Sequence, residues 1–177
     1  IGTRYRGRHA GTFGDVGCFS FYTVKHFTTG EGGMVTTNDA ALAERIRRQR
    51  AFGLDKTVTE RKVPGVYDVT MLGYNYRMNE MAAALGIVQL ASVSGFLDVR
   101  RANDDELRGA LADIEGVSLL AASDAMFSSS RYCGMVILDG ALAPQRFDIV
   151  AALNARGVGT SVYYPHPVPH LQYYRAK

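Results

Sequence analysis

The stretch GTFGDVGCFSFYTVKHFTTGEGGMVTTND, residues 11–39, decides the fold and contains the first candidate for chemistry. A glycine-rich turn leads into an apolar and aromatic run over 16–22, and a second apolar run follows over 32–38. Runs of this composition predict two strands, and the polar residues 23–30 between them predict a loop. A loop between two strands lies at the end of a sheet, so we expect Lys25 where side chains converge on a ligand.

The elements predicted after this stretch alternate between helices and strands. Asn38 or Asp39 suits the N-cap of the first helix and Asn79 that of the second, because their side-chain oxygens accept backbone N–H groups. The predicted elements are helices over 39–52, 81–90, 97–115 and 144–157 and strands over 117–120, 132–138 and 159–164. This order predicts an α/β protein with two unequal parts, residues 1–96 and 97–177.

The composition indicates a folded protein and argues against nucleic-acid binding. Hydrophobic residues make up 47% and charged residues 21% of the chain, which predicts a packed core. The net charge of +3 is too small to indicate nucleic acid as a partner. The arginines between residues 45 and 50 fall around more than one helical face, which favours a solvated helix over a nucleic-acid patch.

The cysteines and the apolar runs bear on the compartment of the protein. Cys18 and Cys133 lie far apart and have no CxxC partner, so we expect buried thiols in the reducing cytoplasm, with neither a disulfide nor a metal site. No apolar run approaches the roughly 20 residues that span a bilayer, so we expect no membrane partner. The polar opening Ile-Gly-Thr-Arg, without an initiator Met or a signal peptide, predicts an internal segment of a larger protein.

Two motifs resemble those of the DegT/StrS family of sugar aminotransferases, which depend on pyridoxal 5'-phosphate (PLP). Residues 11–39 resemble the family's lysine-loop signature: a GxxGD turn, FSF, a lysine five residues after the serine, and GEGG before an apolar strand. The block GYNYRMNEMAAALGIVQL, residues 73–90, resembles the family's NYR motif and the helix after it. The resemblance extends over residues 1–177. It implies part of a type I aminotransferase fold, with 1–96 in the large PLP-binding domain and 97–177 in an incomplete small α/β domain.

The resemblance implies that three residues bind the cofactor. Lys25 would form a Schiff base with PLP and then act as acid and base on the substrate carbon. Ser20 would donate a hydrogen bond to the phosphate of PLP, and Asn75 would reach the phosphate bound by the neighbouring subunit of a homodimer with shared active sites. The residues alone leave alternatives open: a solvated loop lysine, a serine that caps a nearby backbone group and an asparagine that caps a turn.

Two further residues are candidates for contact with the substrate. Tyr22 lies two residues after the serine, so on a strand it would face the same way and either contact substrate or belong to the core. His170 lies in YYPHPVPHLQYY, residues 163–174, which resembles the family's proline-rich segment. The alternative for His170 is a turn or interface histidine.

Transamination is the activity that the resemblance implies. Glutamate would donate an amino group to the cofactor, and the cofactor would pass it to a keto sugar carried on a nucleotide diphosphate. In the family's sugar 3-dehydratases a histidine replaces the Schiff-base lysine, whereas here Lys25 precedes His26, which favours the aminotransferase. A third alternative is a non-catalytic segment with a role in regulation or assembly, because the acidic partner of the PLP ring would lie ahead of Ile1.

Overall fold

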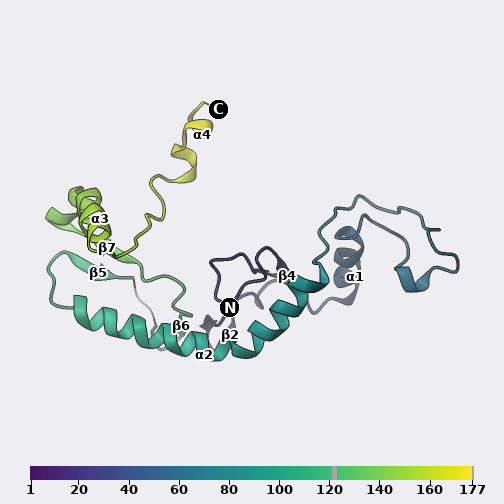
Figure 1. The fold of residues 1–177 in the computed structure, drawn as a ribbon, viewed down its shortest axis with the longest axis horizontal. Helices are drawn as coiled ribbons and strands as arrows, with labels where there is room; N and C mark the ends of the chain where they lie inside the picture. Colours follow the sequence, from purple (N-terminus) through teal and green to yellow (C-terminus); the bar gives the residue numbers. More distant parts are fainter. Residues whose placement is uncertain (121–122, 177) are drawn as a thin grey trace. The chain divides into compact units, whose positions relative to one another are not determined.

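The computed structural model describes residues 1–120 and 123–176, and Figure 1 shows the order of their helices and strands. The described residues form two compact units. The first unit contains residues 1–110 and 119–135, and the second contains 111–118 and 136 onward. The predicted domain boundary between residues 96 and 97 lies inside the first unit, and it stays a prediction for the intact protein.

Two small sheets carry the strands of the first unit. One sheet has the order β2-β1-β6 and consists of β1 (Arg4–Tyr5), β2 (Arg8–His9) and β6 (Phe127–Ser128). The other is the antiparallel pair of β3 (Gly17–Ser20) and β4 (Gly33–Thr36). Because Ser20 lies opposite Gly33, the loop that joins these strands leaves and re-enters the sheet at the same end. This is the position that the sequence predicts for Lys25.

β3 is shorter than the strand predicted over 16–22. It ends at Ser20 because the carbonyl oxygen of Phe21 accepts hydrogen bonds from the hydroxyl of Thr28 at 2.9 Å and from the N–H of Thr29 at 3.0 Å, so the chain turns back there. At its other end β3 begins with Gly17, where a Cβ atom would overlap the carbonyl oxygen of Gly11. Only glycine fits this close approach of two backbone segments.

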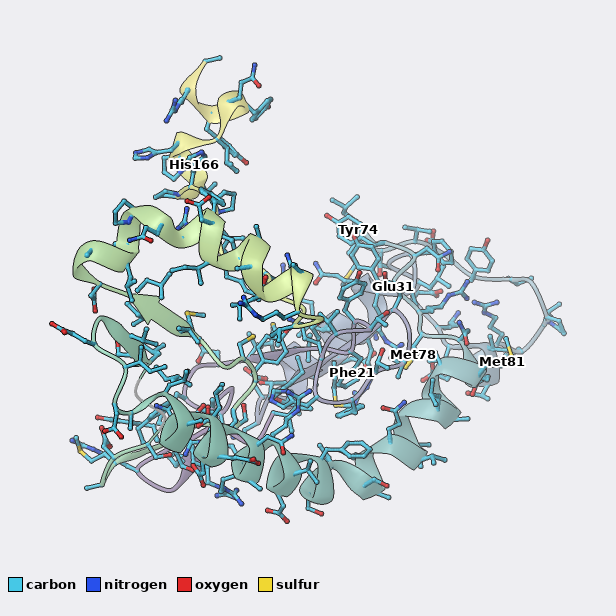
Figure 2. The ribbon with its side chains drawn as sticks, turned by 60° about the vertical axis from the view of Figure 1, so that its left-hand side comes forward. Phe21, Glu31, Tyr74, Met78, Met81 and His166 are labelled. Atoms are coloured by element: carbon cyan, nitrogen blue, oxygen red, sulfur yellow. The ribbon has the colours of Figure 1, made fainter. Side chains whose placement is uncertain are left out.

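The core of the described residues is small. Phe21 is 5% exposed and Phe27 is 4% exposed, and their ring centroids lie 4.7 Å apart. These two rings pack at the base of the lysine loop and hold it against the sheet. The packed core that the composition predicts is confined to these two rings among the described residues, and side chains such as Met81 and Val88 are 82% and 69% exposed. Figure 2 labels Phe21 and Met81 among the side chains.

The first helix, α1 (Ala40–Gln49), confirms the predicted cap at Asp39. The Oδ1 atom of Asp39 accepts a hydrogen bond from the N–H of Leu42 at 3.0 Å, which satisfies a donor of the first turn. The loop after α1 contains one 3-10 turn, η1 (Val58–Glu60). An isolated antiparallel bridge between Ala51 and Asn75 brings the end of this loop back to the end of α1.

A single helix of 32 residues, α2 (Glu80–Leu111), replaces the two helices predicted over 81–90 and 97–115. Its start is as predicted, since Oδ1 of Asn79 accepts a backbone N–H of the first turn at 2.8 Å. The helix continues because residues 91–96 contain no proline, and Gly95 costs only about 1 kcal/mol in a helix. The side chain of Gln89 accepts the N–H of Thr28 at 2.9 Å, so α2 packs against the lysine loop.

By length and composition alone, α2 is apolar enough to cross a membrane. It contains an 18-residue window with a mean hydropathy of 1.6, which corrects the expectation that no apolar run approaches a spanning length. One such helix is weak support for a span, because a helix that packs against protein has the same composition. Here Gly86 permits a close approach, since a Cβ atom there would lie 3.0 Å from the side chain of Thr29.

The second unit combines two strands with short helices. Its elements are β5 (Val117–Leu119), β7 (Val136–Leu138), η2 (Gly140–Gln145), α3 (Arg146–Ala155), η3 (Val168–His170) and α4 (Gln172–Arg175), and β5 and β7 are hydrogen-bonded neighbours. The helix predicted over 144–157 starts two residues later as α3, because Pro144 belongs to the 3-10 turn η2. The strand predicted over 159–164 is wrong, because no described segment pairs with those residues.

Candidate active site

A cavity of about 270 Å³ opens beside the lysine loop in the first unit. Residues from β3, from the lysine loop, from the segment before β1 and from one distant segment line it: Ile1, Cys18, Phe19, Ser20, Lys25, His26, Phe27 and Tyr132. The cavity therefore brings together Lys25 and Ser20, two of the three residues predicted to bind the cofactor. The loop holds both residues at the cavity because the N–H of Thr29 donates to the carbonyl oxygen of Phe21, directly after β3, and so closes the loop.

The amine of Lys25 is half-buried and has one defined partner. The backbone N–H of Lys25 donates to the carbonyl oxygen of Tyr22 at 2.9 Å, so a tight turn sets the direction of the side chain. Its Nζ atom donates to the hydroxyl of Tyr132 at 3.3 Å and lies 4.8 Å from the centroid of that ring. The amine thus combines a hydrogen bond with a cation–π contact, and it lines the cavity.

His26 lines the same cavity, but its ring is held by neighbouring side chains. Nε2 lies 2.9 Å from the hydroxyl of Ser130, and the ring centroid lies 5.3 Å from that of Tyr132. Burial is the main reason that the pKa of His26 falls from 6.5 to about 4, and the positive charges of Arg100 and Lys25 add to this effect. The imidazole is therefore neutral at neutral pH.

We expect the free energy of unfolding to fall as the pH is lowered from 6.5 to about 4. In this range the unfolded chain binds a proton at His26 that the folded chain does not bind, whereas above pH 6.5 both forms are neutral and the stability is complete. Urea unfolding of the wild type and of His26→Gln at several pH values measures the effect, and carboxylates common to both proteins cancel. The loss of unfolding free energy between pH 7 and pH 4 should be about 1 kcal/mol larger in the wild type than in His26→Gln. The effect is this small because solvent screens a half-exposed ring. An equal loss in both proteins would contradict the prediction.

Ser20 ends β3 and lines the cavity. Its Oγ accepts a hydrogen bond from the backbone N–H of Tyr22 at 3.3 Å. This contact is the alternative role expected for the serine, in which it caps a nearby backbone group. A hydroxyl that accepts in this way still has its own hydrogen to donate. The capping contact and the predicted hydrogen bond to a phosphate are therefore compatible.

The other three candidates lie outside the cavity lining. Tyr22 is 46% exposed and follows the end of β3, so the strand alternation on which its prediction rests does not apply. Asn75 precedes α2, and its Oδ1 accepts a hydrogen bond from Nε of Arg77 at 3.3 Å. His170 ends η3 in the second unit. The roles of these residues stay predictions.

The thiols differ from the sequence prediction. Cys18 and Cys133 are free, as expected, but both are exposed rather than buried. Cys18 lines the cavity, whose opening leaves the side chain accessible. Spacing along the chain carries no information about this opening, because residues far away in sequence form part of its wall.

Tyr132 is a residue of the site that the sequence does not predict. It lies 107 residues after Lys25, in a segment predicted as an ordinary strand. No motif surrounds it, since RYCGMVIL has the composition of any buried strand. Only the folded arrangement brings its hydroxyl to the amine.

A lysine amine and a hydroxyl donor on one cavity wall form the arrangement that holds PLP in enzymes. The structure matches that of Spr1654 from Streptococcus pneumoniae, described as a sugar aminotransferase in its PMP form, with a TM-score of 0.90, 28% sequence identity and coverage of 99% of this chain and 46% of that chain. The PLP form of Spr1654 matches with a TM-score of 0.88. The fold is therefore part of the PLP-dependent sugar aminotransferase fold, as the sequence predicts.

The chain belongs to the DegT/DnrJ/EryC1/StrS aminotransferase family, whose sequence model matches residues 1–177. GDP-perosamine synthase of Escherichia coli O157:H7 is 42% identical over 57% of this chain and 26% of its own length. The dTDP-4-dehydro-2,6-dideoxy-D-glucose 3-dehydratase of Saccharopolyspora spinosa is 34% identical over 93% of this chain and 39% of its own length. The chain thus spans less than half the length of these relatives.

The cavity supplies part of what PLP requires. The amine of Lys25 can condense with an aldehyde, and the hydroxyl of Ser20 can donate to a phosphate. Phe19 and Phe27 provide apolar wall. Among the described residues that line the cavity, none carries a carboxylate that could pair with the nitrogen of the PLP ring.

Proposed function

We propose that the intact protein is a PLP-dependent aminotransferase that transfers an amino group from glutamate to a nucleotide-linked keto sugar. The observation that carries this proposal is the amine of Lys25 in a cavity that also presents the hydroxyl of Ser20. Membership of the family and the likeness to PLP and PMP forms of a sugar aminotransferase support it. The relatives named for GDP- and dTDP-linked sugars support the substrate class.

PLP, when bound, supplies an aldehyde that bonds to amines and a ring that stabilises negative charge on the neighbouring carbon. The residues of this chain perform the other tasks. Nζ of Lys25 would hold the cofactor covalently, and as a free amine it would take and return the proton of the substrate carbon. Ser20 would orient the cofactor through its phosphate. The apolar wall excludes water from one side of the cavity.

We propose that the active site is shared within a homodimer and that Asn75 acts in the neighbouring subunit. Asn75 is exposed and lies outside the cavity of its own chain. The tyrosines on either side, Tyr74 and Tyr76, are 48% and 72% exposed and stack at 5.0 Å between ring centroids. An exposed pair of stacked rings next to an amide is suited to burial against another protein surface.

A product assay tests the reaction and separates it from the 3-dehydratase alternative. Intact protein, PLP, glutamate and a nucleotide-linked 4-keto sugar should yield an amino sugar and 2-oxoglutarate in equal amounts. Loss of the 3-hydroxyl group as water, with no amino group transferred to the sugar, would support the dehydratase, to which one relative belongs. The position of Lys25 supports transamination, because its amine lines the cavity whereas Ser130 and Tyr132 hold the ring of His26.

A non-catalytic role is the remaining alternative. It predicts that the intact protein, mixed with PLP, develops no Schiff-base absorbance and gives no PLP adduct after borohydride reduction. An adduct on the peptide that contains Lys25 would exclude this alternative.

A further inference from the structure

Tyr132 reaches the lysine site from a distant segment of the chain and makes the polar contact of the Lys25 side chain. Nζ of Lys25 donates to its hydroxyl at 3.3 Å and lies 4.8 Å from the centroid of its ring. We propose that Tyr132 is a positioning residue that holds the amine of Lys25 whenever that amine is not bonded to the cofactor. The meaning of this contact for catalysis rests on the proposed function, whereas the contact itself does not.

One face of α2 fixes the backbone of the segment that carries Tyr132. Nη1 of Arg100 donates to the carbonyl oxygen of Tyr132 at 3.2 Å. One turn later on the same face, Asp104 is 6% exposed and its Oδ2 lies 3.3 Å from Nε of Arg131. Two consecutive residues of the segment are therefore attached to two residues of one rigid helix.

The lysine loop fixes the same segment from the other side. The hydroxyl of Ser130 lies 2.9 Å from Nε2 of His26, and it accepts a hydrogen bond from the hydroxyl of Thr3 at 3.1 Å. The rings of His26 and Tyr132 lie 5.3 Å apart between centroids, at an interplanar angle of 41°. Tyr132 is thus held between α2 and the lysine loop, and its hydroxyl has a defined place at the cavity.

The contact distinguishes two chemical states of the lysine. When the nitrogen of Lys25 bonds to an aldehyde carbon and a water molecule leaves, the nitrogen gives up hydrogens that it could donate to Tyr132. The hydrogen bond therefore stabilises the free amine relative to the bonded one. Tyr132 receives the amine when a substrate amine displaces it, and it keeps the amine in the cavity for the proton transfers that follow.

Amine acetylation of the intact protein, prepared without cofactor, tests the contact. The sequence has four lysines, Lys25, Lys56, Lys62 and Lys177, so mass spectrometry can follow each modification rate separately. Tyr132→Phe keeps the ring and removes only the hydroxyl. We expect it to raise the acetylation rate of Lys25 about fivefold, since the contact is long and half-buried, and to leave Lys56 and Lys62 unchanged. Tyr67→Phe, at an exposed tyrosine outside the cavity, should change no rate.

An unchanged rate at Lys25 in Tyr132→Phe would overturn the proposal. If the variant fails to fold, all lysines react faster together, and a second measurement on the wild type then decides. A nuclear Overhauser effect between the ε-protons of Lys25 and the ring protons of Tyr132 supports the contact, and its absence in the assigned spectrum rejects it.

Capture of PLP by the intact protein separates this inference from the proposed function. Titration with PLP followed by borohydride reduction should show about fivefold tighter Schiff-base formation at Lys25 in Tyr132→Phe than in the wild type, because the competing contact is lost. Equal capture by both proteins leaves the aminotransferase standing and overturns the role of Tyr132. Faster acetylation in the variant without any capture by either protein supports the contact and rejects the aminotransferase.

Discussion

Replacing Lys25 by alanine in the intact protein should remove the PLP Schiff base and lower the rate of transamination by about a thousandfold or more. The variant loses the covalent attachment of the cofactor and the acid–base group that moves the proton of the substrate carbon, and the second loss alone is worth roughly 10²- to 10⁴-fold. The Schiff-base absorbance and the PLP adduct on the Lys25 peptide should both disappear. Turnover of amino sugar measures the rate.

Lys56→Ala is the matched control for this experiment. Lys56 is also in the first unit, but its side chain is 54% exposed, it pairs with Asp55 at 3.3 Å, and it does not line the cavity. Its removal should leave both the adduct and the turnover unchanged. Full turnover in Lys25→Ala would refute the assignment of Lys25 and, with it, the proposed mechanism.

Replacing Asp104 by alanine should lower the free energy of unfolding by about 3 kcal/mol. The carboxylate is 6% exposed and pairs with Nε of Arg108 at 2.7 Å and with Nε of Arg131 at 3.3 Å. Arg131 is itself only 11% exposed, so the substitution leaves a buried guanidinium with only the exposed carboxylate of Asp105, 3.6 Å away, as a counter-charge. Removing one partner of a buried ion pair costs this much because the remaining charge stays desolvated.

Asp98→Ala on the same helix provides the comparison for Asp104→Ala. Asp98 pairs with Arg101 at 2.7 Å, a distance as short as that of the Asp104–Arg108 pair, but it is 69% exposed. An exposed pair of this kind contributes about 0.5 kcal/mol or less. Urea unfolding of both variants therefore compares a buried ion pair with an exposed one at the same distance between nitrogen and oxygen. Equal losses of unfolding free energy would contradict the stabilising role of the buried Asp104 carboxylate.

Much of the first unit could be predicted from local sequence. Asp39 and Asn79 cap α1 and α2 as expected, because capping depends on a side chain and on N–H groups within three residues. The strands around the lysine loop are also where the sequence predicts them. The long helix α2 was predicted as two helices, because the charged residues after Gly95 change the hydrophobic pattern without breaking the helix.

The candidate site could be predicted only on the side of the lysine loop. Lys25 and Ser20 belong to one motif, so their neighbourhood follows from a short segment of chain. Tyr22 shows the limit of this reasoning, because β3 ends at Ser20 and the alternation of strand side chains ends with it. The predicted strand over 159–164 failed for a related reason: a strand requires a neighbour, and no pattern within the segment supplies one.

The sequence by itself determined the family, the lysine loop and the starts of α1 and α2, since these depend on residues that are close together along the chain. The tertiary structure alone decided that Tyr132 contacts Lys25, that Arg100 and Asp104 hold the segment of Tyr132, and that His26 is neutral. Contacts between residues this far apart along the chain depend on how two elements pack. Burial and electric charge at a site are sums over everything packed there, so a local pattern cannot encode them.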